Sequence, residues 1–130
     1  MPANRFRYFL SYWLPIVVYC LLIYLQSSRP TLENLPEIRY LDKLLHAGAY
    51  ALLGALFLRA LRTSPLGNKP APVMILSILL STLYGISDEL HQYFVPYRTA
   101  ELTDVLANFL GSLLGVLLYG KLTAGPGKIP

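Results

Sequence analysis

The chain has 130 residues, of which 55% are hydrophobic and 14% are charged, with a mean hydropathy of +0.48. This composition is more apolar than that of soluble domains and predicts a membrane protein. The basic residues are scattered, so the net charge of +4 does not indicate a nucleic-acid partner, and the single cysteine, Cys20, excludes an internal disulfide and a cysteine-based metal site.

Four apolar segments approach the length needed to cross a hydrocarbon core about 30 Å thick, which takes roughly 17–25 residues of helix. Together they predict an all-α, integral membrane four-helix bundle that forms one domain over residues 1–130. The expected helices cover residues of about 9–25, 44–61, 73–90 and 105–122.

The first segment follows Arg5 and Arg7, and basic residues also precede the apolar run of a secretory signal peptide. No small-residue cleavage site follows the run, so we interpret it as a retained helix. Pro15 is expected to kink this helix, which membrane helices tolerate when neighbours satisfy the freed carbonyl group.

The distribution of charge indicates an orientation. With the N-terminus inside, seven basic residues fall inside and four outside, in agreement with the positive-inside rule. All seven acidic residues then fall outside, so the two sides carry about +7 and −3. We therefore expect a multi-pass protein of the cell membrane with both termini in the cytoplasm.

Polar residues recur at helical spacing and place one stripe on each of the last three helices. Ionisable side chains in a membrane span cost about 2.5–3.5 kcal/mol, so the stripes are expected to face the bundle interior and the apolar faces to meet lipid. The stripes are Asp42, His46, Tyr50 and Gly54; Ser77, Ser81, Gly85, Asp88 and Gln92; and Asp104, Asn108, Gly111 and Gly115.

Small residues predict close helix packing. Gly111 and Gly115 form a G-x-x-x-G pair, and Ala47, Ala51 and Ala55 offer a second small face. The glycine pair also offers a surface through which a second copy of the chain can associate.

Antiparallel connectivity brings the polar helix ends together at the outer face and predicts a polar site there. A carboxylate near a histidine can act as a general base, crowded carboxylates can supply an acid, and an arginine fork can hold an anion. The same residues could hold a divalent metal, but no H-E-x-x-H spacing is present, so no metal and no cofactor is assigned. The candidate catalytic or binding residues are Asp42, His46, Asp88, Glu89, Gln92, Arg98, Asp104 and Asn108.

These residues also have structural interpretations. Asp42 and Asp104 stand where a carboxylate stabilises a helix N-terminus by about 0.3–1 kcal/mol. A lone His46 is more often a satisfied interfacial histidine than a catalyst, and the whole set can form a network that only fixes helix register. We interpret the remaining acidic residues as solvated loop charges, namely Glu33, Glu37 and Glu101.

Three motifs lie in order along the last three expected helices. They are Asp42-Lys43-x-x-His46-x-x-x-Tyr50, Ser87-Asp88-Glu89-x-His91-Gln92 with Val95-Pro96-x-Arg98, and Asp104-Val105-x-x-Asn108-x-x-Gly111. In this order they resemble the pattern of the VanZ-like family, from which Tyr97 departs because the pattern usually has Gly before the arginine. The resemblance implies a bacterial multi-pass membrane protein, in a family named for an accessory protein of resistance to the glycopeptide teicoplanin.

Two functions from different classes are consistent with these patterns. In the first, the outer polar site binds or acts on a membrane lipid or a lipid-linked precursor of the cell envelope. In the second, the protein is a structural or scaffolding protein whose polar cluster only fixes helix packing. A transporter is disfavoured because the inner halves of the helices are largely Leu, Ala and Gly.

Overall fold

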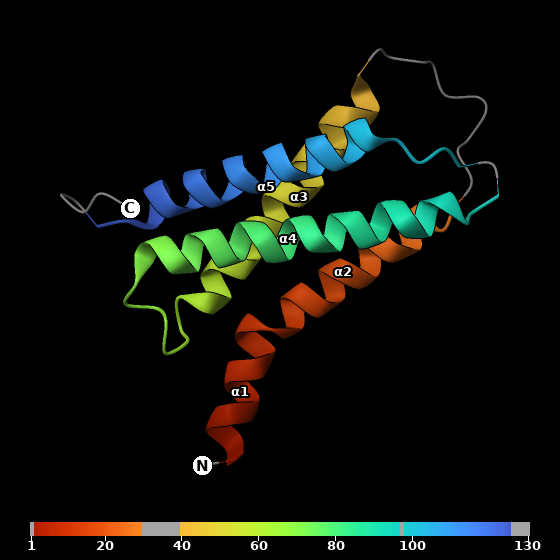
Figure 1. Ribbon diagram of the computed structural model, residues 1–130. Helices are drawn as coiled ribbons and strands as arrows, with labels where there is room; N and C mark the ends of the chain where they lie inside the picture. Colours follow the sequence, from red (N-terminus) through yellow and green to blue (C-terminus); the bar gives the residue numbers. More distant parts are fainter. Residues whose placement is uncertain (1, 30–39, 97, 126–130) are drawn as a thin grey trace.

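The computed structural model describes residues 2–29, 40–96 and 98–125, in which every regular element is an α-helix. Four spans are long and apolar enough to cross a membrane, the first of which joins two helices over Asn4–Ser27. The predicted all-helical membrane fold is confirmed. The helices are α1 (Pro2–Tyr12), α2 (Leu14–Ser27), α3 (Leu41–Leu61), α4 (Pro70–Tyr93) and α5 (Leu102–Thr123) (Figure 1).

Each membrane span extends beyond the apolar run that predicted it. The helix α3 begins at Leu41 rather than residue 44, and α5 begins at Leu102 rather than residue 105. The helix α4 begins at Pro70, whose fixed φ suits the first helical turn. Hydropathy marks the part of a helix that lies in hydrocarbon, so the polar first turns fell outside the predicted bounds.

The first span is interrupted at Trp13, between α1 and α2 (Figure 1). Pro15 has no N–H group, so the carbonyl oxygen of Ser11 loses its helical hydrogen bond. Arg59 of α3 donates to that oxygen at 2.7 Å, and its guanidinium lies 4.7 Å from the ring centroid of Tyr12. The expected break near Pro15 is present, and a neighbouring helix supplies the missing donor.

The helices α3 and α5 form the most extensively packed pair of the bundle. A Cβ atom on Gly111 would lie 2.1 Å from the carbonyl oxygen of Ala47, and one on Gly115 would lie 2.0 Å from that of Ala51. Glycine therefore lets the two backbones touch. The two small faces pack against each other within one chain, and association with a second copy stays a prediction.

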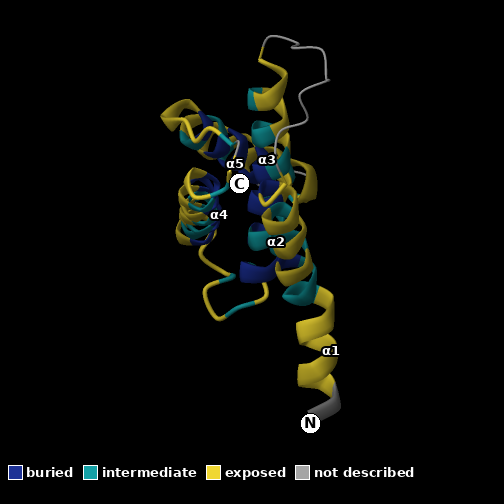
Figure 2. Ribbon diagram, turned by 90° about the vertical axis from the view of Figure 1, so that its right-hand side faces the viewer, coloured by how far each residue is buried: buried dark blue, intermediate teal, exposed yellow. Residues whose placement is uncertain are grey.

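The polar stripe of α4 faces the bundle interior, as its spacing predicts. Ser77, Ser81, Asp88 and Gln92 are buried, and the hydroxyl oxygens of Ser81 and Ser112 lie 2.7 Å apart. The opposite side of α4 is exposed (Figure 2). Its exposed side chains are apolar, so the outer surface of the bundle suits lipid. These exposed residues are Ile75, Leu79, Ile86 and Leu90.

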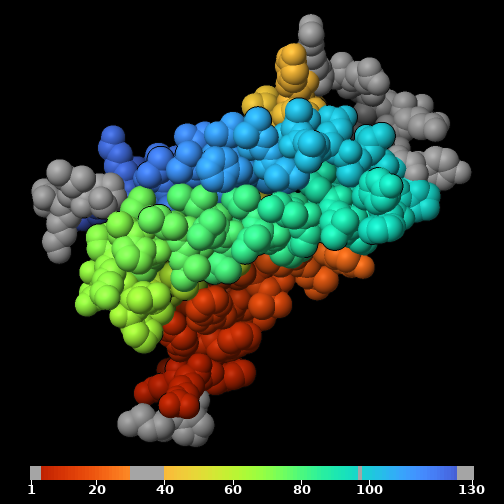
Figure 3. Space-filling model, in the orientation of Figure 1, coloured from red at the N-terminus to blue at the C-terminus, as the bar shows by residue number. Residues whose placement is uncertain are grey.

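The ends of four helices meet at one end of the bundle, which we call the polar end: the C-terminal ends of α2 and α4 and the N-terminal ends of α3 and α5 (Figure 1). The helix α1 extends away from the other helices, on a different side of the molecule from the polar end (Figure 3). The helix α2 packs less extensively on α3 and α4 than these two pack on α5.

Candidate functional site

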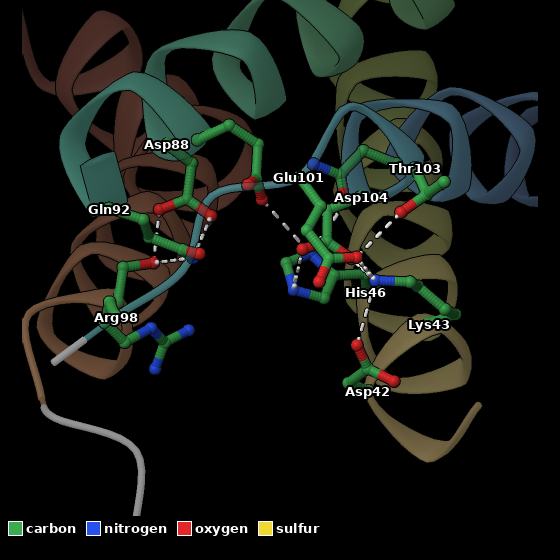
Figure 4. A network of polar contacts seen from close by, with 12 residues as sticks. Asp42, Lys43, His46, Asp88, Gln92, Arg98, Glu101, Thr103 and Asp104 are labelled. Atoms are coloured by element: carbon green, nitrogen blue, oxygen red, sulfur yellow. Dashed lines mark hydrogen bonds and ion pairs between the residues drawn. The ribbon is translucent and has the colours of Figure 1, made fainter. Parts of the chain in front are cut away.

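The polar end holds two groups of interacting side chains. Figure 4 shows Asp88 and Gln92 to one side, and Lys43 and His46 to the other. The Lys43 group consists of Asp42, Lys43, His46, Glu89, Glu101, Asp104 and Asn108, and the Asp88 group consists of Ser27, Tyr50, Asp88 and Gln92.

Lys43 is central to the first group, although it was not among the candidate residues. Its Nζ donates to Asp104 at 2.5 Å, to Glu101 at 2.8 Å and to Asp42 at 3.0 Å. Its ammonium group lowers the pKa of the Glu101 carboxyl, and the Thr103 hydroxyl adds to this effect. Glu101 is exposed, as expected for a loop charge. It also forms an ion pair with Lys43, and the sequence did not predict this contact.

Asp42 and Asp104 occupy the first turns of α3 and α5, where the helix dipole stabilises a negative charge. The two carboxylates differ in environment. The Asp104 side chain is 7% exposed, whereas that of Asp42 is 63% exposed. Of the two, Asp104 is therefore the one placed inside the site, and Asp42 lies at its rim.

His46 links α3 to α4 and α5. Its Nδ1 lies 3.0 Å from Oδ1 of Asn108 and 3.6 Å from Oε1 of Glu89, and its Nε2 lies 4.0 Å from Oδ2 of Asp104. The contact with Asn108 holds the ring between the two carboxylates. One imidazole and two carboxylates thus converge from three helices.

Asp88 has a separate set of partners. Ser27 of α2 donates to Oδ1, while Oδ2 accepts from the Tyr50 hydroxyl at 3.1 Å and from Nε2 of Gln92 at 3.4 Å. All four residues are buried, and a buried carboxylate requires such donors. Ser27 was missed because no motif marks it, and Tyr50 was placed on a stripe but not among the candidates.

The neighbours Asp88 and Glu89 therefore belong to different groups. Successive residues on an α-helix are rotated by about 100° around its axis. This rotation turns Asp88 toward Tyr50 and Ser27 and turns Glu89 toward His46. Among the described residues, the hydrogen bonds and ion pairs give the two carboxylates no common partner, so each is held by its own group.

Glu89 is the least satisfied member of the Lys43 group. Its side chain is 7% exposed, and within the described part of the chain neither carboxylate oxygen has a hydrogen-bond partner. The backbone amide of Glu101 interacts favourably with the carboxylate but falls outside hydrogen-bond geometry. Nδ2 of Asn108 is likewise buried without a partner in that part of the chain.

A cavity of about 240 Å³ lies between α2, α3 and α4, beside the Asp88 group. Leu22, Ile23 and Ala49 contribute to its apolar wall. Arg98 reaches it from the segment after α4, where Nη1 donates to the Arg29 carbonyl at 3.2 Å. Arg98 forms no ion pair with the carboxylates of the described residues. The polar part of the lining is Gln26, Ser27, His46, Asp88, Gln92 and Arg98.

The similarity to a known protein family extends over nearly the whole chain. A model of the VanZ/LLP1 family matches residues 4–123. The chain belongs to the VanZ/LLP1 family. No curated protein and no solved structure matches the chain significantly. The match includes most of α1 and the whole of α2. Because the chain has four candidate membrane spans, this VanZ/LLP1 protein is a multi-pass membrane protein.

The motif residues of this VanZ/LLP1 protein bind to one another across helices. Lys43 of the first motif pairs with Asp104 of the third, and Tyr50 of the first donates to Asp88 of the second. The motifs therefore describe contacts between helices rather than separate local sites. Tyr97, the departure from the family pattern, lies outside the described residues, as do Glu33 and Glu37.

Proposed function

We propose that this VanZ/LLP1 protein binds an anionic, phosphate-bearing lipid of the bacterial cell envelope, either a membrane lipid or a lipid-linked precursor. The polar end lies at the outer face of the cell membrane, and both termini lie in the cytoplasm. The observation that carries this proposal is the cavity between α2, α3 and α4, which joins an apolar wall to a polar end.

The two parts of the cavity suit the two parts of a lipid. Leu22, Ile23 and Ala49 can contact a hydrocarbon chain, and the Arg98 guanidinium can donate to a phosphate in fork geometry. The volume of about 240 Å³ is below the roughly 300–1,000 Å³ of pockets that enclose a drug-sized ligand. The cavity therefore takes the junction of headgroup and chain, and the rest of the chain extends into the bilayer.

Lipid binding is tested by unfolding the purified protein in neutral detergent with phosphatidylglycerol, a polyprenyl phosphate or phosphatidylcholine. A ligand at about a hundred times its Kd stabilises the folded state by about 2.7 kcal/mol. We expect a rise in the unfolding midpoint with at least one anionic lipid and not with phosphatidylcholine. A larger rise with phosphatidylglycerol indicates that the ligand is a membrane lipid, and a larger rise with the polyprenyl phosphate indicates a lipid-linked precursor.

Matched variants distinguish lipid binding in the cavity from nonspecific stabilisation by lipid. Arg98→Gln and Ala49→Trp are expected to remove the lipid-dependent rise, because they delete the cation and fill the apolar wall. Arg7→Gln and Ala71→Trp make the same chemical changes at exposed positions and should retain it. Equal stabilisation by phosphatidylcholine, or an undiminished rise in Arg98→Gln, contradicts the proposal.

A role in helix packing is the second candidate, and the Asp88 group favours it. Ser27, Tyr50 and Gln92 satisfy the Asp88 carboxylate and connect α2, α3 and α4. In that case, Arg98→Gln and Ala49→Trp change the unfolding midpoint equally with and without lipid. A deletion strain and a Glu89→Ala strain would also have the same lipid and peptidoglycan-precursor profiles as the parent.

A further inference from the structure

Three side chains of the Lys43 group have the arrangement of metal ligands. His46 comes from α3, Glu89 from α4 and Asp104 from α5, and each offers one ligand atom within 4.8 Å of the others. Nδ1 of His46 lies 3.6 Å from Glu89, and Nε2 lies 4.0 Å from Asp104, so one of the two ring nitrogens serves as the ligand. Two atoms bound at 2.0–2.2 Å to one ion stand no more than about 4.4 Å apart, so the three ligand atoms draw slightly together when they bind it.

The buried carboxylate of Glu89 provides an independent argument for a cation. Both of its oxygens are buried without a hydrogen-bond partner in the described residues, and its side chain is 7% exposed. An ionised carboxylate in such a place is costly unless it is paired or coordinates a metal. Asp88, its neighbour on α4, has three donors and needs no ion.

The local charge also favours a cation. Four carboxylates belong to the Lys43 group, and Lys43 is the ammonium that pairs with three of them. Lys43 contacts Oδ1 of Asp104, whereas Oδ2 faces His46 and remains available as a ligand. Arg98 interacts with Glu89 only through longer-range electrostatics. The group therefore keeps an excess of negative charge at its buried side.

We propose that His46, Glu89 and Asp104 bind one divalent transition-metal ion, Zn²⁺ or Mn²⁺. Imidazole nitrogen favours Zn²⁺ over Ca²⁺ and Mg²⁺, and carboxylate oxygen suits both Zn²⁺ and Mn²⁺. Three protein ligands leave a coordination position for water or an oxygen of a bound molecule. This site goes beyond the proposed lipid binding and does not depend on it, because metal is bound by side chains of the protein alone.

The test uses the full chain in detergent, stripped with a chelator and then titrated with Zn²⁺, Mn²⁺, Ca²⁺ or Mg²⁺ without added lipid. Bound metal is measured by elemental analysis after desalting, and stability by thermal unfolding. We expect one Zn²⁺ or Mn²⁺ per chain and a rise in the unfolding midpoint. His46→Ala, Glu89→Gln and Asp104→Asn should each weaken binding by at least about tenfold, since even residues that only support ligands contribute that much.

Two carboxylates serve as matched controls. Asp88→Asn removes the adjacent buried carboxylate, and Glu101→Gln removes an exposed one from the same group, and both should retain the ion. The metal-free Glu89→Gln protein should be at least as stable as the metal-free wild type, because the change removes a buried carboxylate that accepts no hydrogen bond from the described residues. Absence of stoichiometric Zn²⁺ or Mn²⁺ in the wild type overturns the proposal, as does an equal loss of binding in Glu89→Gln and Asp88→Asn. Either result leaves the lipid proposal standing.

Discussion

The Tyr50 hydroxyl is one of the groups that make the burial of Asp88 tolerable. Tyr50 is 1% exposed and donates to Oδ2 of Asp88 at 3.1 Å, an oxygen whose other contact, with Gln92, is 3.4 Å long. Tyr50→Phe removes this donor and little volume. A hydrogen bond to a charged group contributes about 1.5–3 kcal/mol, so we expect the free energy of unfolding in detergent to fall by that amount.

Tyr84→Phe is the matched control for this prediction. The Tyr84 hydroxyl also donates to a neighbouring helix, but its acceptor is the uncharged backbone carbonyl of Cys20 in α2. A hydrogen bond between neutral groups contributes about 0.5–1.5 kcal/mol. Losses of the same size in the two variants would show that the charge of Asp88 does not strengthen the Tyr50 bond.

At the scale of residues, helical spacing predicted the burial of Asp88, Gln92, Asp104 and Asn108 because each lies on a stripe of polar or small residues. It could not predict the partners. The residues Lys43 and Glu101 lie 58 positions apart and meet only because α3 and α5 are aligned. Such alignment depends on tertiary packing, which no local pattern records.

At the scale of elements, the contact between α3 and α5 depends on Gly111 and Gly115. An alanine Cβ at either position would fall within 2.1 Å of a backbone oxygen, so the helices must separate to accept it. We expect Gly111→Ala and Gly115→Ala each to lower the free energy of unfolding by about 1–3 kcal/mol or more, as overpacking does. Denaturant unfolding in detergent measures the change.

Gly48 of α3 offers the control, because a Cβ there would meet nothing within 4 Å. Alanine is favoured over glycine within a helix by about 0.8–1.0 kcal/mol, so Gly48→Ala should be neutral or stabilising. If all three variants lost stability equally, the close approach of α3 and α5 would not be the cause.

The elements themselves were largely predictable, and their relative placement was not. The spacing of Gly111 and Gly115 marked a close contact, and the small face of Ala47 and Ala51 was recognised separately. Nothing in either pattern states that the two faces meet in one chain. The metal-ligand arrangement of His46 with two carboxylates escaped spacing rules for the same reason, since its members come from three helices.

At the scale of the whole molecule, the orientation in the membrane is a prediction from charge. In a Cys20→Ala background, single cysteines are placed at Ala100, at the polar end, and at Asn68, between α3 and α4; both positions are exposed. A membrane-impermeant maleimide applied to intact cells should label the cysteine at 100 and reach the one at 68 only after lysis. The reverse pattern would place the termini outside.

Hydropathy was sufficient to predict the four spans, because the bundle has an apolar outer surface and each span exceeds the thickness of the hydrocarbon core. It could not predict the cavity at the polar end. That cavity depends on how α2 leans on α3 and α4, and α2 carries no motif that specifies its register.

The bond between Arg59 and the Ser11 carbonyl has a consequence for how the chain can evolve. Replacing Arg59 first leaves a carbonyl without a donor inside the first span, whereas replacing Pro15 first restores an N–H that can bond to Ser11 and makes Arg59 dispensable. The intermediate that lacks only Arg59 is therefore less stable than the intermediate that lacks only Pro15. Lineages should lose the proline before the arginine, which makes this mutational path directional, and the two positions should co-vary among descendants.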